Sequence, residues 1–185
     1  MTTEQRLALL EARLREIEDR EAIFDCIKRS SRGIDRFDAE LTSSSFHPES
    51  LHANGRSQVA GAQYAQHANK SHGMLFDATL HNITLQLCEI DGDVAHAESY
   101  SLGLFLDKHG ETGRMLAGRY IDRLEKRDGA WRIVLRRATV EVALEGKAVL
   151  PNGQLLPGSN YLRGNRDHGD PSYERPLGMN TGAHW

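Results

Sequence analysis

Cysteine is scarce in this sequence, and no long apolar run is present. Its two cysteines are Cys26 and Cys88. They fall in a predicted helix and a predicted strand without metal-ligand spacing, so we interpret them as buried free thiols in a reducing compartment. No apolar run approaches the roughly 18 residues that span a bilayer, and the charged first 20 residues lack the apolar stretch of a signal peptide. A soluble cytoplasmic protein is expected.

Neither sign of charge is in large excess, because 23 Lys and Arg against 26 Asp and Glu give a net charge of −3. Neither a nucleic-acid partner nor binding to an anionic membrane is therefore indicated. A glycine-rich phosphate loop, a GxSxG motif and an HExxH motif are also missing from the sequence. We expect no nucleotide, flavin or metal cofactor. The length of 185 residues suits one domain with a substantial core.

The pattern divides the chain into a helical extension over residues 1–20, an α+β domain over residues 21–145 and an extended arm over residues 146–185. In the extension, apolar residues recur with a 3-4-3 spacing, typical of a helix whose narrow seam packs on a neighbouring element or subunit. The pattern changes phase near Asp19, so either the helix bends there or a second helix begins with Asp19 as its cap. The seam consists of Leu7, Leu10, Leu14 and Ile17.

The domain begins with helices and ends with long strands joined by short turns. Short turns favour antiparallel neighbours, because parallel neighbours need long crossovers. The sequence therefore predicts an α+β fold, with a curved antiparallel sheet packed against N-terminal helices. After the first helix, shorter helices are predicted over residues 37–46 and 61–71, with a short strand over 50–54. The long strands are predicted over residues 79–90, 94–106, 115–126 and 131–144.

The last 40 residues hold seven of the 17 glycines and four of the five prolines, so regular structure is not expected there. They also carry too many apolar residues for a free tail. We expect an ordered arm that wraps over the domain or over a neighbouring subunit. Its apolar residues are Leu150, Leu155, Leu156, Tyr161, Leu162, Tyr173, Leu177 and Trp185.

One acid, Asp35, falls on the apolar face of the first helix. Eleven residues return a helix to nearly the same angle, so Asp35 should point inward as Phe24 does. A carboxylate that faces a core needs hydrogen-bond or charge partners. Both a buried salt-bridge or capping role and a catalytic role remain open.

A histidine, His81, falls on an apolar strand face in the same way. The alternation places it with Ile83, Leu85 and Leu87 on one face of the strand. A neutral imidazole in such a dry wall needs a partner for its N–H. A satisfied core histidine and a general base both fit this pattern.

Two further groups of polar residues lie on the later strands. Arg136 and Arg137 are adjacent, so one of them faces the cavity, and the smaller residues that share the parity of Arg136 favour Arg136. Solvated or subunit-bridging arginines are the alternative. His96, Glu98 and Tyr100 alternate on one strand face, which favours a cross-strand polar ladder over a metal site.

Three runs of the sequence resemble the SnoaL-like family of the nuclear-transport-factor-2-like superfamily. They are REAIFDCIKRSSRGIDRFDAELTSSSFHP, ATLHNITLQLCEIDGDVAHAESY and GRYIDRLEKRDGAWRIVLRRATVEV, and the tail DHGDPSYERPLG is similar as well. The resemblance implies a cone-shaped sheet and an elimination catalyst like scytalone dehydratase, hexachlorocyclohexane dehydrochlorinase or bile-acid dehydratase. Asp35 in RGIDRF then matches the family acid, His81 in TLHNIT the family base, and Arg136 an arginine of the last strand.

The sequence departs from this family pattern at Ser30. Five residues before the acid, the bile-acid dehydratases have Tyr and the dehydrochlorinases have Lys, whereas this chain has Ser. A site without the tyrosine hydroxyl or the lysine ammonium group at this position cannot assist a leaving group in the same way. The resemblance therefore implies that Asp35 and His81 form the acid–base pair (the dyad) of the family, but it does not imply the family's substrates.

The expected function is a cofactor-independent lyase, a dehydratase, acting on a small apolar cyclic or aromatic-derived molecule. His81 would abstract a proton from carbon, Asp35 would orient His81, and Arg136 or Tyr120 would stabilise the departing anion. An isomerase or cyclase with the same dyad, a ligand-binding module and the small subunit of a ring-hydroxylating dioxygenase are the alternatives. The resemblance also implies a homo-oligomer, a trimer, that uses the outer sheet face and the arm. Candidate substrate contacts are Ser30, Phe24, Ile83 and Tyr120.

Overall fold

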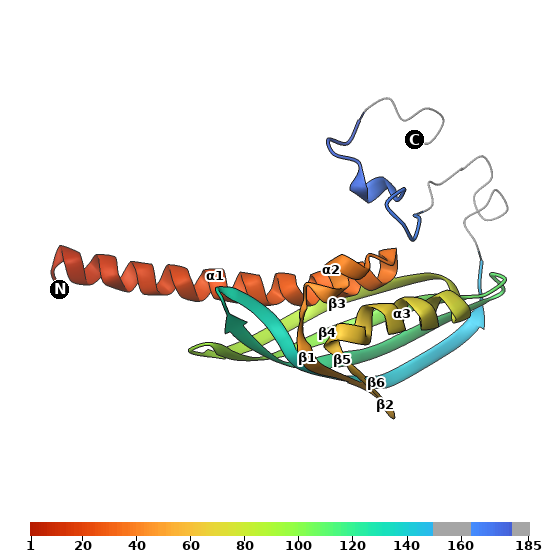
Figure 1. Cartoon of the computed structure of the whole chain (residues 1–185), viewed down its shortest axis with the longest axis horizontal. Coiled ribbons are helices and arrows are strands. Elements are labelled where there is room, and N and C mark those ends of the chain that lie inside the picture. The colour runs from red at the N-terminus through yellow and green to blue at the C-terminus, as the bar shows by residue number, and fades with distance from the viewer. Residues whose placement is uncertain (150–163, 179–185) are drawn as a thin grey trace.

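The computed structural model describes residues 1–149 and 164–178. It has the predicted α+β architecture, in which helices lie against a strongly curved, open sheet (Figure 1). The α-helices of the described residues are α1 (Thr3–Arg36), α2 (Ala39–Ser43) and α3 (Gly61–Leu75). The strands are β1 (Phe46–Asn54), β2 (Ser57–Ala60), β3 (Phe76–Asp91), β4 (Val94–Asp107), β5 (Thr112–Arg127) and β6 (Ala130–Lys147).

The strands follow the order β2-β1-β6-β5-β4-β3. The four long strands form the predicted antiparallel meander, whereas β1 runs parallel to β6 and β2 was not predicted. The helix predicted over residues 37–46 is shorter than expected, because α2 ends at Ser43 and β1 already begins at Phe46 and passes through His47 and Pro48. Pro48 lies where the pairing of β1 with β6 is interrupted, between Phe46 and Leu51, so its missing N–H removes no regular ladder hydrogen bond.

Helix α1 is one continuous helix of 34 residues, so no bend and no new helix begins at Asp19. Asp19 instead accepts hydrogen bonds from Trp131 Nε1 (2.8 Å) and Lys126 Nζ (2.7 Å). Up to this point α1 projects beyond the sheet, and after it α1 packs on the sheet (Figure 1). The phase change in the sequence therefore marks one helix that presents apolar residues in two directions.

Two irregularities in the sheet decide which side chains face inward. In β3, Thr84 and Leu85 together lie opposite Tyr100, because Ile83 pairs with Ser101 and Gln86 pairs with Ser99. Such a bulge reverses the parity of the strand. The predicted dry wall is therefore wrong beyond Ile83, since Leu85 and Leu87 lie on the outer face and are 52 % and 56 % exposed.

The second irregularity lies in β6. Ile133 pairs with Leu124 and Leu135 pairs with Arg123, so Val134 is the extra residue. The bulge brings Arg136 to the same inner face as Trp131 and Ile133, and all three are buried. Arg136 thus points inward and Arg137 outward, because of the bulge and not because of the regular alternation on which the prediction rested.

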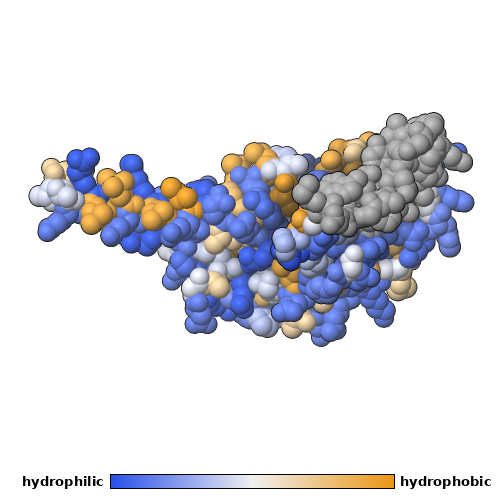
Figure 2. All heavy atoms as spheres, turned by 90° about the horizontal axis from the view of Figure 1, so that it is seen from above, coloured by the Kyte–Doolittle hydropathy of each residue, from blue (hydrophilic) through white to orange (hydrophobic). Residues whose placement is uncertain are grey.

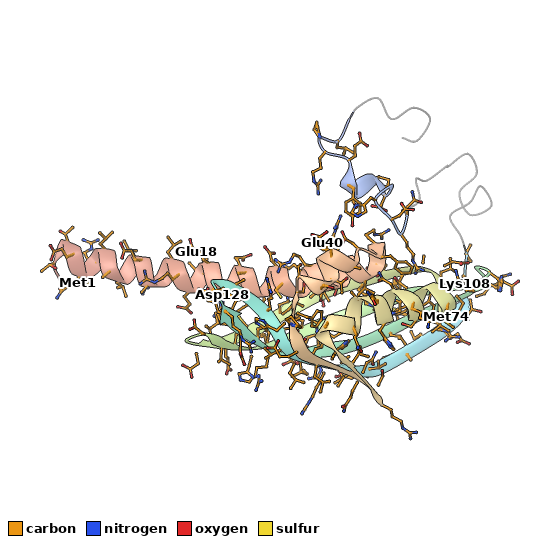
Figure 3. The ribbon with its side chains drawn as sticks, viewed as in Figure 1. Met1, Glu18, Glu40, Met74, Lys108 and Asp128 are labelled. Atoms are coloured by element: carbon orange, nitrogen blue, oxygen red, sulfur yellow. The ribbon has the colours of Figure 1, made fainter. Side chains whose placement is uncertain are left out.

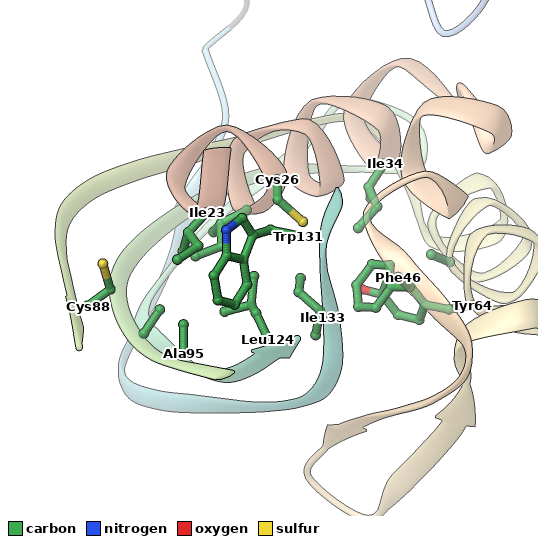
Figure 4. Close-up of a cluster of buried hydrophobic side chains, with 13 residues drawn as sticks. Ile23, Cys26, Ile34, Phe46, Tyr64, Cys88, Ala95, Leu124, Trp131 and Ile133 are labelled. Atoms are coloured by element: carbon green, nitrogen blue, oxygen red, sulfur yellow. The ribbon is translucent and has the colours of Figure 1, made fainter. Parts of the chain in front are cut away.

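The core lies between the C-terminal half of α1 and the concave side of the sheet (Figure 4). Both cysteines are free and buried, as predicted. None of the helices in the described residues is both long enough and apolar enough to cross a membrane. Only α1 is long enough, and it contains many charged residues. The buried cluster comprises Ile23, Cys26, Ile27, Ile34, Phe46, Tyr64, Ala68, Cys88, Ala95, Ala97, Leu124, Trp131 and Ile133.

The described part of the C-terminal arm packs on its own domain. A short 3₁₀ turn (Pro171–Tyr173) brings the Tyr173 hydroxyl to Asp38 (2.6 Å), and Asp170 accepts a hydrogen bond from Arg36 (3.0 Å). Leu177 is exposed. The remaining predicted arm residues, Leu150, Leu155, Leu156, Tyr161, Leu162 and Trp185, lie outside the described residues.

Candidate active site

Asp35 points into the domain from the last turn of α1, with 4 % of its surface exposed. Its Oδ1 accepts hydrogen bonds from the Thr79 hydroxyl (2.9 Å) and from His81 Nδ1 (2.7 Å). Its Oδ2 accepts one from the His81 backbone N–H (2.7 Å). Three donors on β3 thus satisfy a carboxylate that would otherwise be costly to bury. The structure brings Asp35 and His81 together, while their catalytic role stays a prediction.

This contact selects one tautomer of the His81 ring. An ionised carboxylate can only accept hydrogen bonds, so the proton of the neutral ring lies on Nδ1. Nε2 then carries a lone pair and can accept a proton. A general base needs such a nitrogen beside a space that a substrate can enter.

Two cavities meet at the Asp35–His81 pair. The smaller cavity, of about 320 Å³, is lined by His81 and Tyr120. The larger and more open cavity, of about 1200 Å³, is lined by Asp35 and by Arg166 of the arm. Phe105 borders both cavities. The pair therefore lies between a smaller cavity and a larger, more open one.

Aromatic rings hold the His81 imidazole in place. The His72 ring stacks on it nearly parallel, with ring centres 5.9 Å apart, and the Phe105 ring meets it at 90° and 5.4 Å. Burial, together with smaller contributions from His81 and Arg166, lowers the pKa of His72 to about 4. His72 is therefore uncharged at neutral pH and packs on His81 without adding a positive charge.

Arg136 lies beneath the smaller cavity rather than in its wall. Its Nε and Nη2 donate to the two oxygens of Asp122 (2.8 and 2.7 Å), and Nη1 donates to the Ser30 hydroxyl (2.8 Å). Its guanidinium carbon lies 4.2 Å from the centre of the Tyr120 ring. Burial acts to lower the pKa of Arg136, but Asp122 and the neighbouring tyrosines raise it above its ordinary value. Direct contact of Arg136 with a departing anion is contradicted, because it is 1 % exposed and borders neither cavity.

Three of the four predicted substrate contacts also lie outside the cavities. Ser30 is fully buried, and its hydroxyl donates to the Ile27 carbonyl while accepting from Arg136. Phe24 shares the helix face of Asp35, but at 1.5 Å per residue it lies about 16 Å away along α1 and packs on the core. Ile83 packs there too. Tyr120 does line the smaller cavity.

The site also contains residues that the sequence analysis missed. Thr79 shares the strand parity of His81, so that alternation could have identified it as a donor to Asp35. His72 and Arg166 gave no local signal, because α3 and the arm bring them to the site from elsewhere in the chain. Arg166 Nη1 donates to the Phe76 carbonyl (2.7 Å), and its guanidinium lies over the Phe37 ring at 4.5 Å.

The outer sheet face carries the polar ladder expected there. Glu98 on β4 accepts a hydrogen bond from Arg119 on β5 (2.9 Å), and Arg119 also pairs with Glu141 on β6. Within the described residues, no three His, Cys, Asp or Glu side chains gather as a metal site would require.

This architecture, a cone-shaped sheet with a buried acid on the first helix, defines a nuclear-transport-factor-2-like protein. The SnoaL-like domain family matches residues 15–137, so the chain belongs to that family. None of the curated proteins is a match to this chain.

Solved structures with the same fold include three from this superfamily. A hexachlorocyclohexane dehydrochlorinase (LinA, type 2) has 21 % identity and a TM-score of 0.70, covering 76 % of this chain and 98 % of its own. A scytalone dehydratase-like protein from Novosphingobium aromaticivorans has 17 % identity and a TM-score of 0.64, covering 70 % and 88 %. A protein of the NTF2-like superfamily from Salmonella enterica has 21 % and 0.58, covering 64 % and 87 %. These similarities establish the fold.

We expect Arg136→Met to destabilise the protein by about 3–5 kcal/mol, because it leaves Asp122 charged and buried without its partner. The double variant Asp122→Leu/Arg136→Met removes both charges and should recover most of this loss. Denaturant unfolding of the two variants and the wild type measures the difference. A single variant as stable as the wild type would show that the pair does not support the fold.

Proposed function

We propose that the protein is a cofactor-independent lyase that catalyses a dehydratase-like elimination on a small, apolar, cyclic or aromatic-derived molecule. The observation that carries this proposal is the Asp35–His81 pair, in which Nδ1 of His81 is bound to the carboxylate at 2.7 Å and Nε2 is left as the base. His81 borders the smaller cavity, where a substrate would meet it. Two neighbours in fold, a dehydrochlorinase and a scytalone dehydratase-like protein, support an elimination.

In the proposed reaction, Nε2 of His81 takes a proton from a carbon of the substrate. The electrons of that C–H bond form a carbon–carbon double bond, and the bond from the neighbouring carbon to the leaving oxygen breaks. Asp35 stabilises the imidazolium that results. The imidazolium proton then passes to the departing oxygen, so that water leaves and the base is restored.

Tyr120 is the residue best placed to assist the departing oxygen. It lines the smaller cavity with His81. Burial raises the pKa of the Tyr120 hydroxyl, although Arg136 beside it acts in the opposite direction. The phenol therefore keeps its proton at neutral pH and can donate a hydrogen bond to developing negative charge. Arg136 acts through Tyr120, whose ring it supports from below.

The lining of the smaller cavity supports the proposed class of substrate. A volume of about 320 Å³ is at the lower end of the range for small-molecule sites. Its wall combines aromatic and aliphatic side chains with several polar ones, which suits a compact ring that carries oxygen substituents. The polar side chains are His52, Asn54, Ser71, His72, His81, Ser101 and Thr139. The larger cavity beside Asp35 would be the approach from solvent. The residues that form the apolar wall include Ile34, Tyr64, Leu75, Phe76, Phe105 and Leu116.

We expect His81→Ala to lower the turnover of a hydroxylated alicyclic or polyketide-like substrate by about 10²–10⁴-fold while the protein stays folded. Asp35→Asn should lower it as well. In this variant the side-chain carbonyl oxygen would accept the hydrogen bond from the His81 backbone N–H. The side-chain NH₂ group would then face Nδ1 of His81, which disfavours the tautomer that carries its proton on Nδ1. Turnover is followed by product formation in a panel of such compounds, with circular dichroism to check folding.

His67→Ala is the matched control, because His67 is an exposed histidine on α3 that borders neither cavity. It should leave turnover unchanged. Full activity of His81→Ala would remove His81 from the mechanism. Uptake of solvent deuterium into an isomer of the substrate, with no loss of water, would establish an isomerase instead.

We also propose that three copies associate through the outer sheet face. Apolar side chains on β3, β4 and β5 are more than one third exposed there and surround the Glu98–Arg119 pair. Light scattering should give a mass of about three times 20.7 kDa, and Leu87→Arg should lower it. A monomer at micromolar concentration would contradict this assembly. The side chains are Leu85, Leu87, Tyr100 and Ile121.

A further inference from the structure

The seam of α1, formed by Leu7, Leu10, Leu14 and Ile17, is exposed along its whole length. These four side chains are 57 %, 61 %, 55 % and 60 % exposed. Figure 2 shows apolar groups in a row along the projecting part of the helix. Between Met1 and Glu18 this part extends past the β5–β6 turn that carries Asp128 (Figure 3). A regular apolar row of this kind is the contact face of a coiled coil.

The seam faces away from the domain to which it is attached. At 100° per residue, Asp19 and Ile23, which contact the domain, lie about 160° around the helix from the centre of the seam. The N-terminal end of α1 is well formed, because Thr2 and Gln5 make a capping box. Most of the seam also precedes residue 15, where the match to the SnoaL-like family begins. The seam therefore serves neither the core of its own domain nor the common part of the family fold.

The charged residues beside the seam follow a strict order. With Leu7 and Leu14 at position a of a seven-residue repeat, Leu10 and Ile17 occupy position d. Every position g that flanks the seam is then an arginine, and every position e is a glutamate. Within the described residues, Arg6, Arg13, Glu11 and Glu18 make no ion pair with another part of the chain. The flanking residues are Arg6, Arg13 and Arg20 at g, and Glu4, Glu11 and Glu18 at e.

This order is complementary to a second copy of itself in one orientation. When identical helices lie parallel, position g of one faces position e of the next repeat on the other, so that Arg6 meets Glu11 and Arg13 meets Glu18. In an antiparallel pair, g would face g and e would face e, which places arginine against arginine and glutamate against glutamate. The charges thus favour the parallel arrangement and oppose the antiparallel one.

We infer that residues 3–20 of α1 form a parallel coiled coil with the same residues of other copies of this chain. The partner is a second copy, because the charges of the helix complement their own pattern. Leucine at both a positions and Ile17 at a d position favour more than two helices over a simple pair. The coiled coil is a second contact between copies, separate from the outer sheet face. This inference does not depend on the proposed enzymatic function.

The orientation is tested by cysteine cross-linking of the full chain. Thr3 is exposed, occupies position d and lies on the centre line of the seam. In a parallel coil, Thr3→Cys brings the new thiols of neighbouring copies together, so mild oxidation should give a disulfide-linked dimer. Cys26 and Cys88 are buried and should not react. Ala12→Cys, on the opposite side of the helix, is the matched control and should cross-link only at the slow rate of random collision.

Charge reversal in the Thr3→Cys background tests the partner. Arg6→Glu with Arg13→Glu puts glutamate against glutamate between copies, and should lower the cross-linking rate roughly tenfold or more. Adding Glu11→Arg and Glu18→Arg restores opposite charges and should restore the rate. All four residues are exposed, so the domain should stay folded throughout. Equal cross-linking of Thr3→Cys and Ala12→Cys, or a rate unaffected by charge reversal, would overturn the inference.

Discussion

The buried carboxylate of Asp35 is the constraint on which the rest of the site depends. An ionised group inside a domain is tolerated where hydrogen-bond donors surround it, and here Thr79 and His81 of β3 supply all three. The same contacts join the end of α1 to the beginning of the meander. The hydrogen bonds that allow α1 to pack on the sheet therefore also orient the His81 ring. The same contacts thus stabilise the fold and set the proposed catalytic geometry.

A buried ion pair lies against Tyr120 of the smaller cavity. Arg136 binds Asp122 through two hydrogen bonds and also binds Ser30, which connects β6, β5 and α1 beneath Tyr120. Ser30 stands where the family resemblance implies Tyr in the bile-acid dehydratases and Lys in the dehydrochlorinases, and its hydroxyl accepts a hydrogen bond from Arg136. Ser30, the residue at which this chain departs from the family patterns, therefore lies beneath the smaller cavity and contacts the arginine that packs against Tyr120.

Much of the fold follows from sequence pattern, because helix periodicity, strand alternation and glycine turns are local signals. The inward direction of Asp35 was predictable for the same reason. The bulges in β3 and β6 were not, because an extra residue in a strand leaves no local signature and reverses every side chain beyond it. Leu85 and Leu87 were consequently assigned to the wrong face. His72 and Arg166 reach the site from α3 and the arm, and only tertiary structure brings them there.

The most direct test of the account is the tautomer of His81. In ¹⁵N NMR of histidine-labelled protein at about pH 9, where an imidazole is neutral, His81 should carry its proton on Nδ1 and a bare Nε2. Asp35→Asn should move the proton toward Nε2. A wild-type His81 with its proton on Nε2 would contradict the account, because the ring could then neither donate to Asp35 nor act as the base at the cavity.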